Sequence, residues 1–79
     1  MGWPKFQVGE QVEMLCDHLH ADGQRVTSWQ PGQVTAVDER MVAVQFNVQV
    51  FANPGWPVAD RTLWCTHGSR RLRRLDEFD

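Results

Sequence analysis

Two short Cys-x-His units are the residues of this chain best suited to bind a metal. Cys16 and His18 form the first unit, and Cys65 and His67 form the second. Two thiols and two imidazoles could provide the tetrahedral ligand set that zinc accepts, and positions i and i+2 of a strand share one face. The spacing, however, matches no established zinc motif, and both cysteines lie in apolar patterns. Buried free cysteine is the more common explanation, so the sequence predicts no metal site and no cofactor.

A group of histidines and carboxylates raises the question of acid–base catalysis. His18 and His20 stand close to Asp17 and Asp22 in the chain. Such groups transfer protons when they are placed against a substrate, but no nucleophile is positioned to be activated by them. Neither of the two serines lies in a recognisable nucleophile motif, and the chain has no glycine-rich phosphate loop. The sequence therefore predicts that the protein is not an enzyme.

An arginine cluster near the end of the chain suggests contact with phosphates. It contains half of the eight basic residues: Arg70, Arg71, Arg73 and Arg74. Arginine pairs bidentately with phosphate oxygens. Against this, the net charge of −2 disfavours nucleic-acid binding by the surface as a whole, and three acidic residues close the chain, Asp76, Glu77 and Asp79. We favour a solvated, salt-bridged strand here and keep nucleic-acid binding as the alternative function.

The connection over residues 51–58 is unusually apolar. It carries Phe51, Trp56 and Val58 around the strong turn signal Asn53-Pro54-Gly55. Such side chains either fold back over the core or are offered to another molecule. We favour folding back. If the rings are exposed instead, this connection is the best candidate surface for a partner or a second copy, because tryptophan anchors dominate interface energetics.

The elements that must position these groups are β-strands. From Val42 to Val50, valine or phenylalanine occupies every second position, and the positions between them carry alanine, glutamine or asparagine. A period of two over this length is typical of a strand with one apolar face. Weaker patterns of the same kind predict the other strands, which cover residues 11–16, 32–37, 61–66 and 70–75.

Two segments leave their structure more open. Residues 17–28 have little periodicity and predict a long loop, with a hairpin turn at Asp22-Gly23 as the alternative. In the tail, Leu72 and Leu75 are three positions apart, which suits a helical turn capped by Ser69. A short final strand fits equally well, and we favour the strand because the sheet needs closing.

Length and composition limit the class of protein. The 79 residues predict a single domain over 1–79, with four tryptophans and no tyrosine. Such a chain buries only roughly 60% of its unfolded surface, so self-association is a reasonable way to extend its core. The N-terminal residues lack the apolar segment of a signal peptide, and no apolar run is long enough to span a membrane. We expect a cytoplasmic protein with reduced thiols.

Taken together, these elements resemble the SH3-like barrels of the Tudor and Agenet type. The resemblance covers nearly the whole chain and implies a single all-β domain, a five-stranded SH3-like barrel. The residues that carry it are Phe6-x-x-Gly9-x-x-Val12, Trp29-x-x-Gly32-x-Val34-x-x-Val37, Val42-x-Val44-x-Phe46 and Leu72-Arg73.

Members of that family often hold methylated lysine or arginine in a cage of aromatic rings. The resemblance implies that Trp29 and Phe46 occupy cage-related positions, with His18 and His20 where a further ring would stand and Trp56 as a wall. The cage is incomplete, because tyrosine is absent and Phe46 lies on the apolar face of its strand. We therefore expect a working cage to be the minor outcome.

The chain is also similar in length and fold class to the type II dihydrofolate reductases, which are SH3-like and assemble their active site at a tetramer pore. The Val-Gln-Ile-Tyr segment of that family is missing. In its place the chain offers only Val44-Gln45-Phe46 and Val48-Gln49-Val50. A small oligomeric enzyme is therefore the third hypothesis, behind the two binding functions.

The leading hypothesis is a noncatalytic interaction module. It would bind a protein or peptide, with self-association as an additional property and no membrane contact. The alternative is a nucleic-acid-binding barrel that uses the four clustered arginines. The side chains that we expect at the binding surface of the module are Trp29, Phe51, Trp56, Trp64, His18 and His20.

Overall fold

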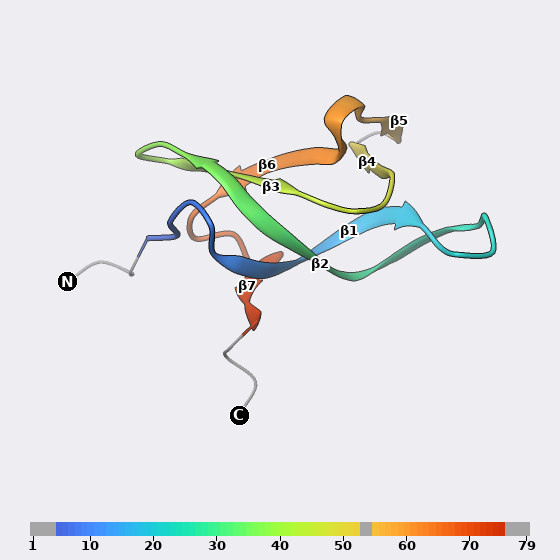
Figure 1. The fold of residues 1–79 in the computed structure, drawn as a ribbon, viewed down its shortest axis with the longest axis horizontal. Coiled ribbons are helices and arrows are strands. Elements are labelled where there is room, and N and C mark those ends of the chain that lie inside the picture. The colour runs from blue at the N-terminus through green and yellow to red at the C-terminus, as the bar shows by residue number, and fades with distance from the viewer. Residues whose placement is uncertain (1–4, 53–54, 76–79) are drawn as a thin grey trace.

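The chain folds into one curled antiparallel β-sheet with a short 3₁₀ turn and no α-helix in the part that is described (Figure 1). A computed structural model describes residues 5–52 and 55–75. None of the described residues belongs to a helix long and apolar enough to cross a membrane. The 3₁₀ turn covers Ala59–Arg61, and the strands are β1 (Gln11–Leu19), β2 (Arg25–Val37), β3 (Met41–Gln45), β4 (Val50–Ala52), β5 (Trp56–Pro57), β6 (Thr62–Thr66) and β7 (Leu72–Arg74).

The order of the strands in the sheet is β5-β4-β1-β2-β3-β6, and β7 pairs with β1. A long hairpin of β1 and β2 forms the middle, with Gln11 opposite Gln33 and Leu19 opposite Arg25. The second edge of β1 is divided, because β7 pairs with its first half and β4 with its last residues. The sheet therefore curls until its last strand returns to its first.

Alternation along the strands supplies the core. In β1, Val12, Met14 and Cys16 are buried, while the residues between them are only partly covered. This is the period of two that a strand with one apolar face requires. Branched and aromatic side chains, which pack well on a pleated surface, supply most of the core: Phe6, Val12, Met14, Cys16, Val34, Val42, Val44, Phe46, Val50 and Leu72.

A bulge in β2 contributes to the curl. Val34 lies opposite Val44, but the next pair is Ala36 with Ala43, so Thr35 is an extra residue in β2. An extra residue on one strand bends it and increases the local twist. The bend turns β3, and β6 beyond it, back towards the edge of β1.

His67 ties three distant segments together. Its Nδ1 accepts a hydrogen bond from the backbone N–H of Phe6 at 3.2 Å, and its Nε2 donates to the carbonyl oxygen of Asp38 at 2.9 Å. Because a carbonyl oxygen can only accept, the ring is the Nε2–H tautomer. The ring also stacks on Phe6 with centroids 6.3 Å apart. The N-terminal segment, the β2–β3 turn and the end of β6 are thus held at one corner of the sheet.

Gly32 marks a close approach of β2 to the end of β3. A Cβ atom at this position would lie 2.7 Å from Cγ1 of Val44 and 2.9 Å from the carbonyl oxygen of Gln45. Both distances are shorter than side chains tolerate, and one of the two neighbouring atoms belongs to the backbone. Glycine is therefore required here by space rather than by its freedom in φ.

The substitution Gly32→Ala is expected to lower the free energy of unfolding by about 1–3 kcal/mol, because the added methyl group overpacks a crossing that cannot open without moving β3. Urea unfolding followed by tryptophan fluorescence measures the change. Gly68→Ala is the matched control, because nothing lies within 4 Å of a Cβ atom there. Equal stability of the two variants would contradict the close crossing.

The predicted strand over residues 42–50 is wrong as a single element. β3 ends at Gln45, the chain bends at Asn47 and Val48, and β4 begins at Val50. Phe46 is still 2% and Val50 0% exposed, so the inward period of two persists through a bend that breaks the strand. This split adds one strand, and β5 inside the predicted loop adds another. The described part of the chain therefore has seven strands, and the predicted number of five is not confirmed.

The predicted long loop over residues 17–28 is also wrong. β1 continues to Leu19 and β2 begins at Arg25, so only a tight turn separates them. Its hydrogen bonds run from Gly23 N–H to the His20 carbonyl at 2.9 Å and from His20 N–H to the Gln24 carbonyl at 2.7 Å. The alternative, a hairpin turning at Asp22-Gly23, is confirmed.

The remaining strand predictions agree with the structure. β6 covers Thr62–Thr66, one residue shorter than expected, and the tail forms the strand β7 rather than a helical turn. All-β architecture over the described residues is therefore established, with a barrel-like curl. The turn signal Asn53-Pro54-Gly55 cannot be assessed at its first two positions, which lie outside the described residues.

Candidate functional site

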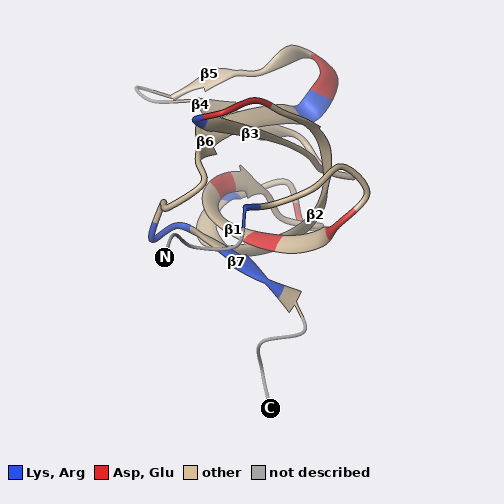
Figure 2. Ribbon diagram, turned by 90° about the vertical axis from the view of Figure 1, so that its left-hand side faces the viewer, with Lys and Arg blue, Asp and Glu red and all other residues tan. Residues whose placement is uncertain are grey.

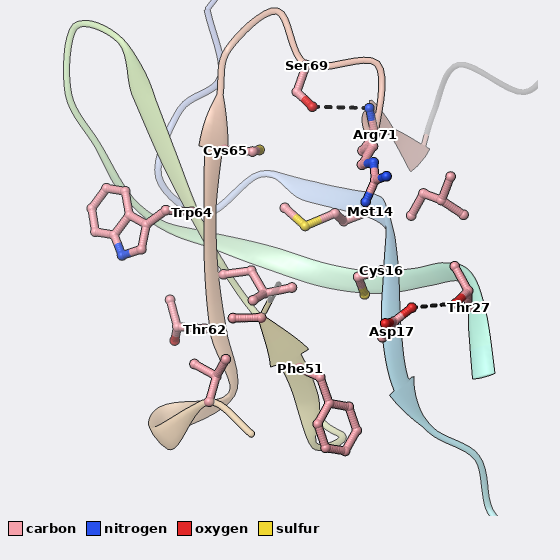
Figure 3. A pocket seen from close by; sticks show the side chains of 14 residues that line it. Met14, Cys16, Asp17, Thr27, Phe51, Thr62, Trp64, Cys65, Ser69 and Arg71 are labelled. Atoms are coloured by element: carbon pink, nitrogen blue, oxygen red, sulfur yellow. Dashed lines mark hydrogen bonds between the residues drawn. The ribbon is translucent and has the colours of Figure 1, made fainter. Parts of the chain in front are cut away.

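A hollow lies beside β6 at the point where the curled sheet stays open. β6 pairs with β3 along one edge and, among the described residues, with no other strand. Opposite its second edge stands β1, and between the two strands is a hollow of about 810 Å³ (Figure 3). β4 and the turn before β7 contribute its ends. Volumes of this size are typical of small-molecule and peptide sites.

Apolar side chains and polar groups contribute about equally to the surface of this hollow. The side chains of Met14 and Cys16 line it from β1, and those of Leu63 and Cys65 line it from β6. In Figure 3 Cys65 points across the hollow towards β1, whereas Trp64 points away from it. Trp64 keeps 55% of its surface exposed, so a large ring stands on the outer side of the same strand.

Two charged residues stand at the rim. Asp17 accepts a short hydrogen bond from the hydroxyl of Thr27, and the backbone N–H of Arg71 donates to Oγ of Ser69 at 3.1 Å (Figure 3). The Arg71 side chain is exposed. No ion pair or hydrogen bond engages its guanidinium within residues 5–52 and 55–75. The hollow thus combines apolar and polar surface, and Arg71 adds a positive charge at its mouth that no described residue engages.

Both cysteine thiols of the hollow are poor nucleophiles. Burial raises the pKa of Cys16 from its usual 9.0 to about 11, and the carboxylate of Asp17 adds to the effect. Burial alone raises the pKa of Cys65 to about 11. Nucleophilic attack requires the thiolate, so it is not favoured at these two thiols at neutral pH.

The histidines of the two Cys-x-His units face other partners. Nδ1 of His18 lies 3.1 Å from the carbonyl oxygen of Leu19 and Nε2 lies 2.8 Å from Oγ of Ser28. Both ring nitrogens of His67 bond the backbone, as described above. No group of three or more histidine, cysteine or acidic side chains suited to a metal occurs among the described residues. The prediction of no metal site stays a prediction.

The residues expected to form an aromatic cage are not brought together. Phe46 is in the core, and Trp29 lies half-buried on the outer face of β2. The guanidinium carbon of Arg73 lies 3.8 Å from the Trp29 ring centroid, so a cation from the same chain already covers that ring. His18 is 5% exposed inside β1, not in a loop, and His20 lies in the exposed hairpin turn beside Asp22.

In the apolar connection over residues 51–58, some of the described side chains fold back over the core and one is exposed. Phe51 and Val58 fold back, since both line the hollow and Val58 packs on the core. Arg25 covers the Phe51 ring at 3.8 Å. Trp56, in contrast, is 71% exposed on β5. It is available for contact with another molecule but does not line the hollow.

The arginine cluster separates into two engaged and two exposed side chains. Arg73 bonds Oε1 of Glu13 through Nε at 3.1 Å and Nη2 at 3.0 Å. Arg74 forms an ion pair with Glu10 and covers the Phe6 ring at 4.1 Å. In Figure 2 basic β7 accordingly lies beside acidic positions. Arg70 and Arg71 remain exposed, and the acidic residues Asp76, Glu77 and Asp79 lie outside the described residues.

Nucleic-acid binding through all four arginines therefore stays a prediction, and it has lost support. Two of the four guanidinium groups already neutralise carboxylates of the same chain. Counterion release, which drives such binding, requires free cations on one surface. The favoured alternative of a salt-bridged strand describes β7 well.

Several residues of the hollow were not expected to be functional. Sequence reasoning selected Phe51, Trp64 and Arg71 but missed Met14 and Leu63, which form much of the interior. Met14 has the pattern of a core residue and is 4% exposed, and Leu63 is half-buried beside the edge of β6 that pairs with no described strand. The available signal was the sequence of β6 itself, which contains no charged residue.

Comparison with known proteins gives no relative for this chain: no family model, no curated protein and no solved structure matches it.

The raised thiol pKa values predict slow modification of the folded protein. At pH 8 the thiolate fraction at a pKa of about 11 is about 100-fold smaller than at 9.0, so both cysteines should react with a disulfide reagent about 100-fold more slowly than free cysteine. Absorbance of the released thiolate measures the rate. In urea the rates should rise to that of free cysteine. Rapid reaction in the folded state would contradict the burial of these thiols.

Proposed function

We propose that this chain is a noncatalytic interaction module that binds a segment of another protein at the hollow between β6 and β1. The finer proposal on its fold is that the curled sheet is an SH3-like barrel of the Tudor and Agenet type. The observation that carries the function is the hollow itself, with apolar side chains from β1 and β6, the guanidinium of Arg71 at the rim and an exposed tryptophan, Trp64, on the outer side of β6.

The chemistry of the lining supports recognition rather than catalysis. Thioether, thiol and branched side chains supply most of the interior, from Met14, Cys16, Leu63 and Cys65. Such groups adapt to apolar ligands but offer neither a proton acceptor nor a nucleophile, because the thiols are held protonated. A catalytic centre would need convergent titratable groups. The hollow presents shape and two charges at its rim, those of Asp17 and Arg71, instead.

The covered rings argue against a methyl-ammonium reader. A methylated lysine is held by cation–π attraction in a cage of open ring faces. Here the faces of Trp29 and Phe51 already carry Arg73 and Arg25, each at 3.8 Å. A methylated ligand would have to displace these guanidinium groups. Apolar and backbone contacts at the hollow are therefore the favoured mode of binding.

This function is tested by selecting peptides that bind the intact chain from a random display library. The methyl carbon resonance of Met14, which lines the hollow, should shift when a selected peptide is added. The resonance of Met41 is the internal control, because that residue lies in β3 and does not line the hollow. Selection of no peptide, or peptides that leave Met14 unchanged, would contradict binding at this site.

The same spectra decide between the remaining hypotheses. Trimethyllysine and a short oligonucleotide should leave the Met14 resonance and the Trp29 indole resonance in place. Oligonucleotide shifts confined to Arg70 and Arg71 that vanish with added salt would instead favour nucleic-acid binding, since phosphate contacts are strongly salt-dependent.

A further inference from the structure

We infer that the partner binds as an added β-strand along the open edge of β6, and that it carries an acidic residue that reaches Arg71. The inference rests on the proposed function, because it names the conformation and chemistry of the segment that the hollow receives. Its support comes from the backbone of β6, which the proposed function does not use.

The hydrogen bonds between β3 and β6 show which backbone groups of β6 remain open. Phe46 N–H donates to the Arg61 carbonyl at 2.9 Å, and His67 N–H donates to the Arg40 carbonyl at 3.1 Å. In an antiparallel ladder every second residue bonds the same neighbour. Because the register is regular from Thr62 to Thr66, Leu63 and Cys65 bond β3. The backbone groups of Trp64 therefore point to the opposite edge.

On this edge the backbone N–H and C=O of Trp64 find no partner within the described ranges. The carbonyl oxygen of Thr66 accepts a hydrogen bond from the Ser69 N–H at 3.1 Å, but no described group bonds the N–H of Thr66. A strand at the sheet spacing of about 4.8 Å would satisfy these donors and the acceptor. The open edge is therefore a template for an extended backbone.

β6 also lacks the features that normally protect a sheet edge. Such edges usually carry a charge, a proline or a bulge, or are very short. The strand Thr62–Thr66 has no charge and no proline, and its register with β3 contains no bulge. The other end of the sheet is protected, because β5 has two residues and one of them is Pro57. The contrast marks β6 as the edge that is kept open.

The faces of β6 define the side chains that suit the partner. Residues opposite each other in neighbouring strands share a face. One set of partner side chains would lie beside Leu63 and Cys65 and enter the hollow, while the alternate set would lie beside Trp64. The first set should be apolar, because Leu63 and Cys65, beside which it would lie, are apolar and pack against the core. The second can be polar or aromatic, because that face is open to water.

The position of Arg71 fixes where the charge of the partner lies. Ser69 bonds the carbonyl oxygen of Thr66, so the turn that carries Arg71 stands at the last residue of β6. Figure 3 shows Arg71 above the hollow at this end, with Thr62 at the other. A carboxylate next to Thr66 would form a charge-assisted pair with the guanidinium. In an antiparallel strand this is the amino-terminal part of the partner segment.

A second copy of the chain fits this surface less well. If two β6 strands met edge to edge, Leu63 and Cys65 of each copy would stay packed in their own sheet, as they do in the single chain. The hollow beside each strand would then remain unfilled. A segment of another protein can place apolar side chains at alternate positions, and these side chains would fill the hollow.

The test uses the strongest peptide selected on the intact chain, synthesised with single N-methyl groups along its backbone. N-methylation removes one donor at a time and leaves the side chains unchanged. We expect alternate positions to lose about tenfold in affinity, while the positions between them change by less than about twofold. Equal sensitivity at all positions, or none at any, would overturn strand addition even if Met14 still reports binding at the hollow.

Variants of the chain provide the reciprocal measurement. Trp64→Pro and Trp64→Ala both remove the indole, but only proline removes the open N–H. Proline is tolerated where the N–H faces away from the sheet. We expect Trp64→Pro to bind the peptide about tenfold more weakly than Trp64→Ala. Equal affinities of the two would overturn the inference. The N-methyl series decides the matter if the proline variant is unfolded by circular dichroism.

The acidic contact has its own matched pair. Arg71→Glu should lower the affinity for the peptide about three- to tenfold. Arg70→Glu makes the same charge change at an exposed neighbour that does not line the hollow, and it should change the affinity by less than about twofold. Equal effects would show that only net charge matters.

Sedimentation of the unliganded chain tests self-association at the same edge. A dimer that Trp64→Pro abolishes would assign the open edge to a second copy and overturn the inference.

Discussion

β1 is the strand on which the rest of the sheet depends, because it pairs with three other strands, β2, β4 and β7. One edge bonds β2 over all nine residues, and the other is shared between β7 at residues 12–14 and β4 at residues 17 and 18. The sheet can meet this arrangement only by curling until its last strand returns to its first. The short stretch of β1 between the two partners, Leu15 and Cys16, is left as a wall of the hollow.

Arginine has a structural role in the curled sheet. Among the described residues, guanidinium groups lie on aromatic rings at distances of 3.8–4.1 Å in the pairs Arg25 with Phe51, Arg73 with Trp29 and Arg74 with Phe6. Each such contact contributes about 0.5–1 kcal/mol when it is exposed. Rings and cations that could serve recognition separately are thus used within the chain. Under the proposal made above, recognition would instead use the open edge of β6 and the hollow beside it.

The sequence predicted the class of structure and most of the inward-facing residues, because a period of two shows which side chains share a face. It could not show that the chain bends after Gln45, since Phe46 and Val50 are buried on both sides of the bend and the pattern continues unbroken. Nor could it show the hollow. That site exists because β6 has one neighbour instead of two, and the number of neighbours of a strand is decided by tertiary pairing rather than by its own residues.

The closing pair of the sheet joins residues far apart in the chain. Glu13 and Arg73 are 60 positions apart, so the first strand to be synthesised waits for nearly the last one. In a growing chain the β1–β2 hairpin can form early, but it presents an apolar face and an unpaired edge until residues 72–74 emerge. A product that stops before them would expose both to proteases and to other unfolded chains. Protection of this apolar face and edge therefore depends on residues 72–74 as much as on the hairpin itself.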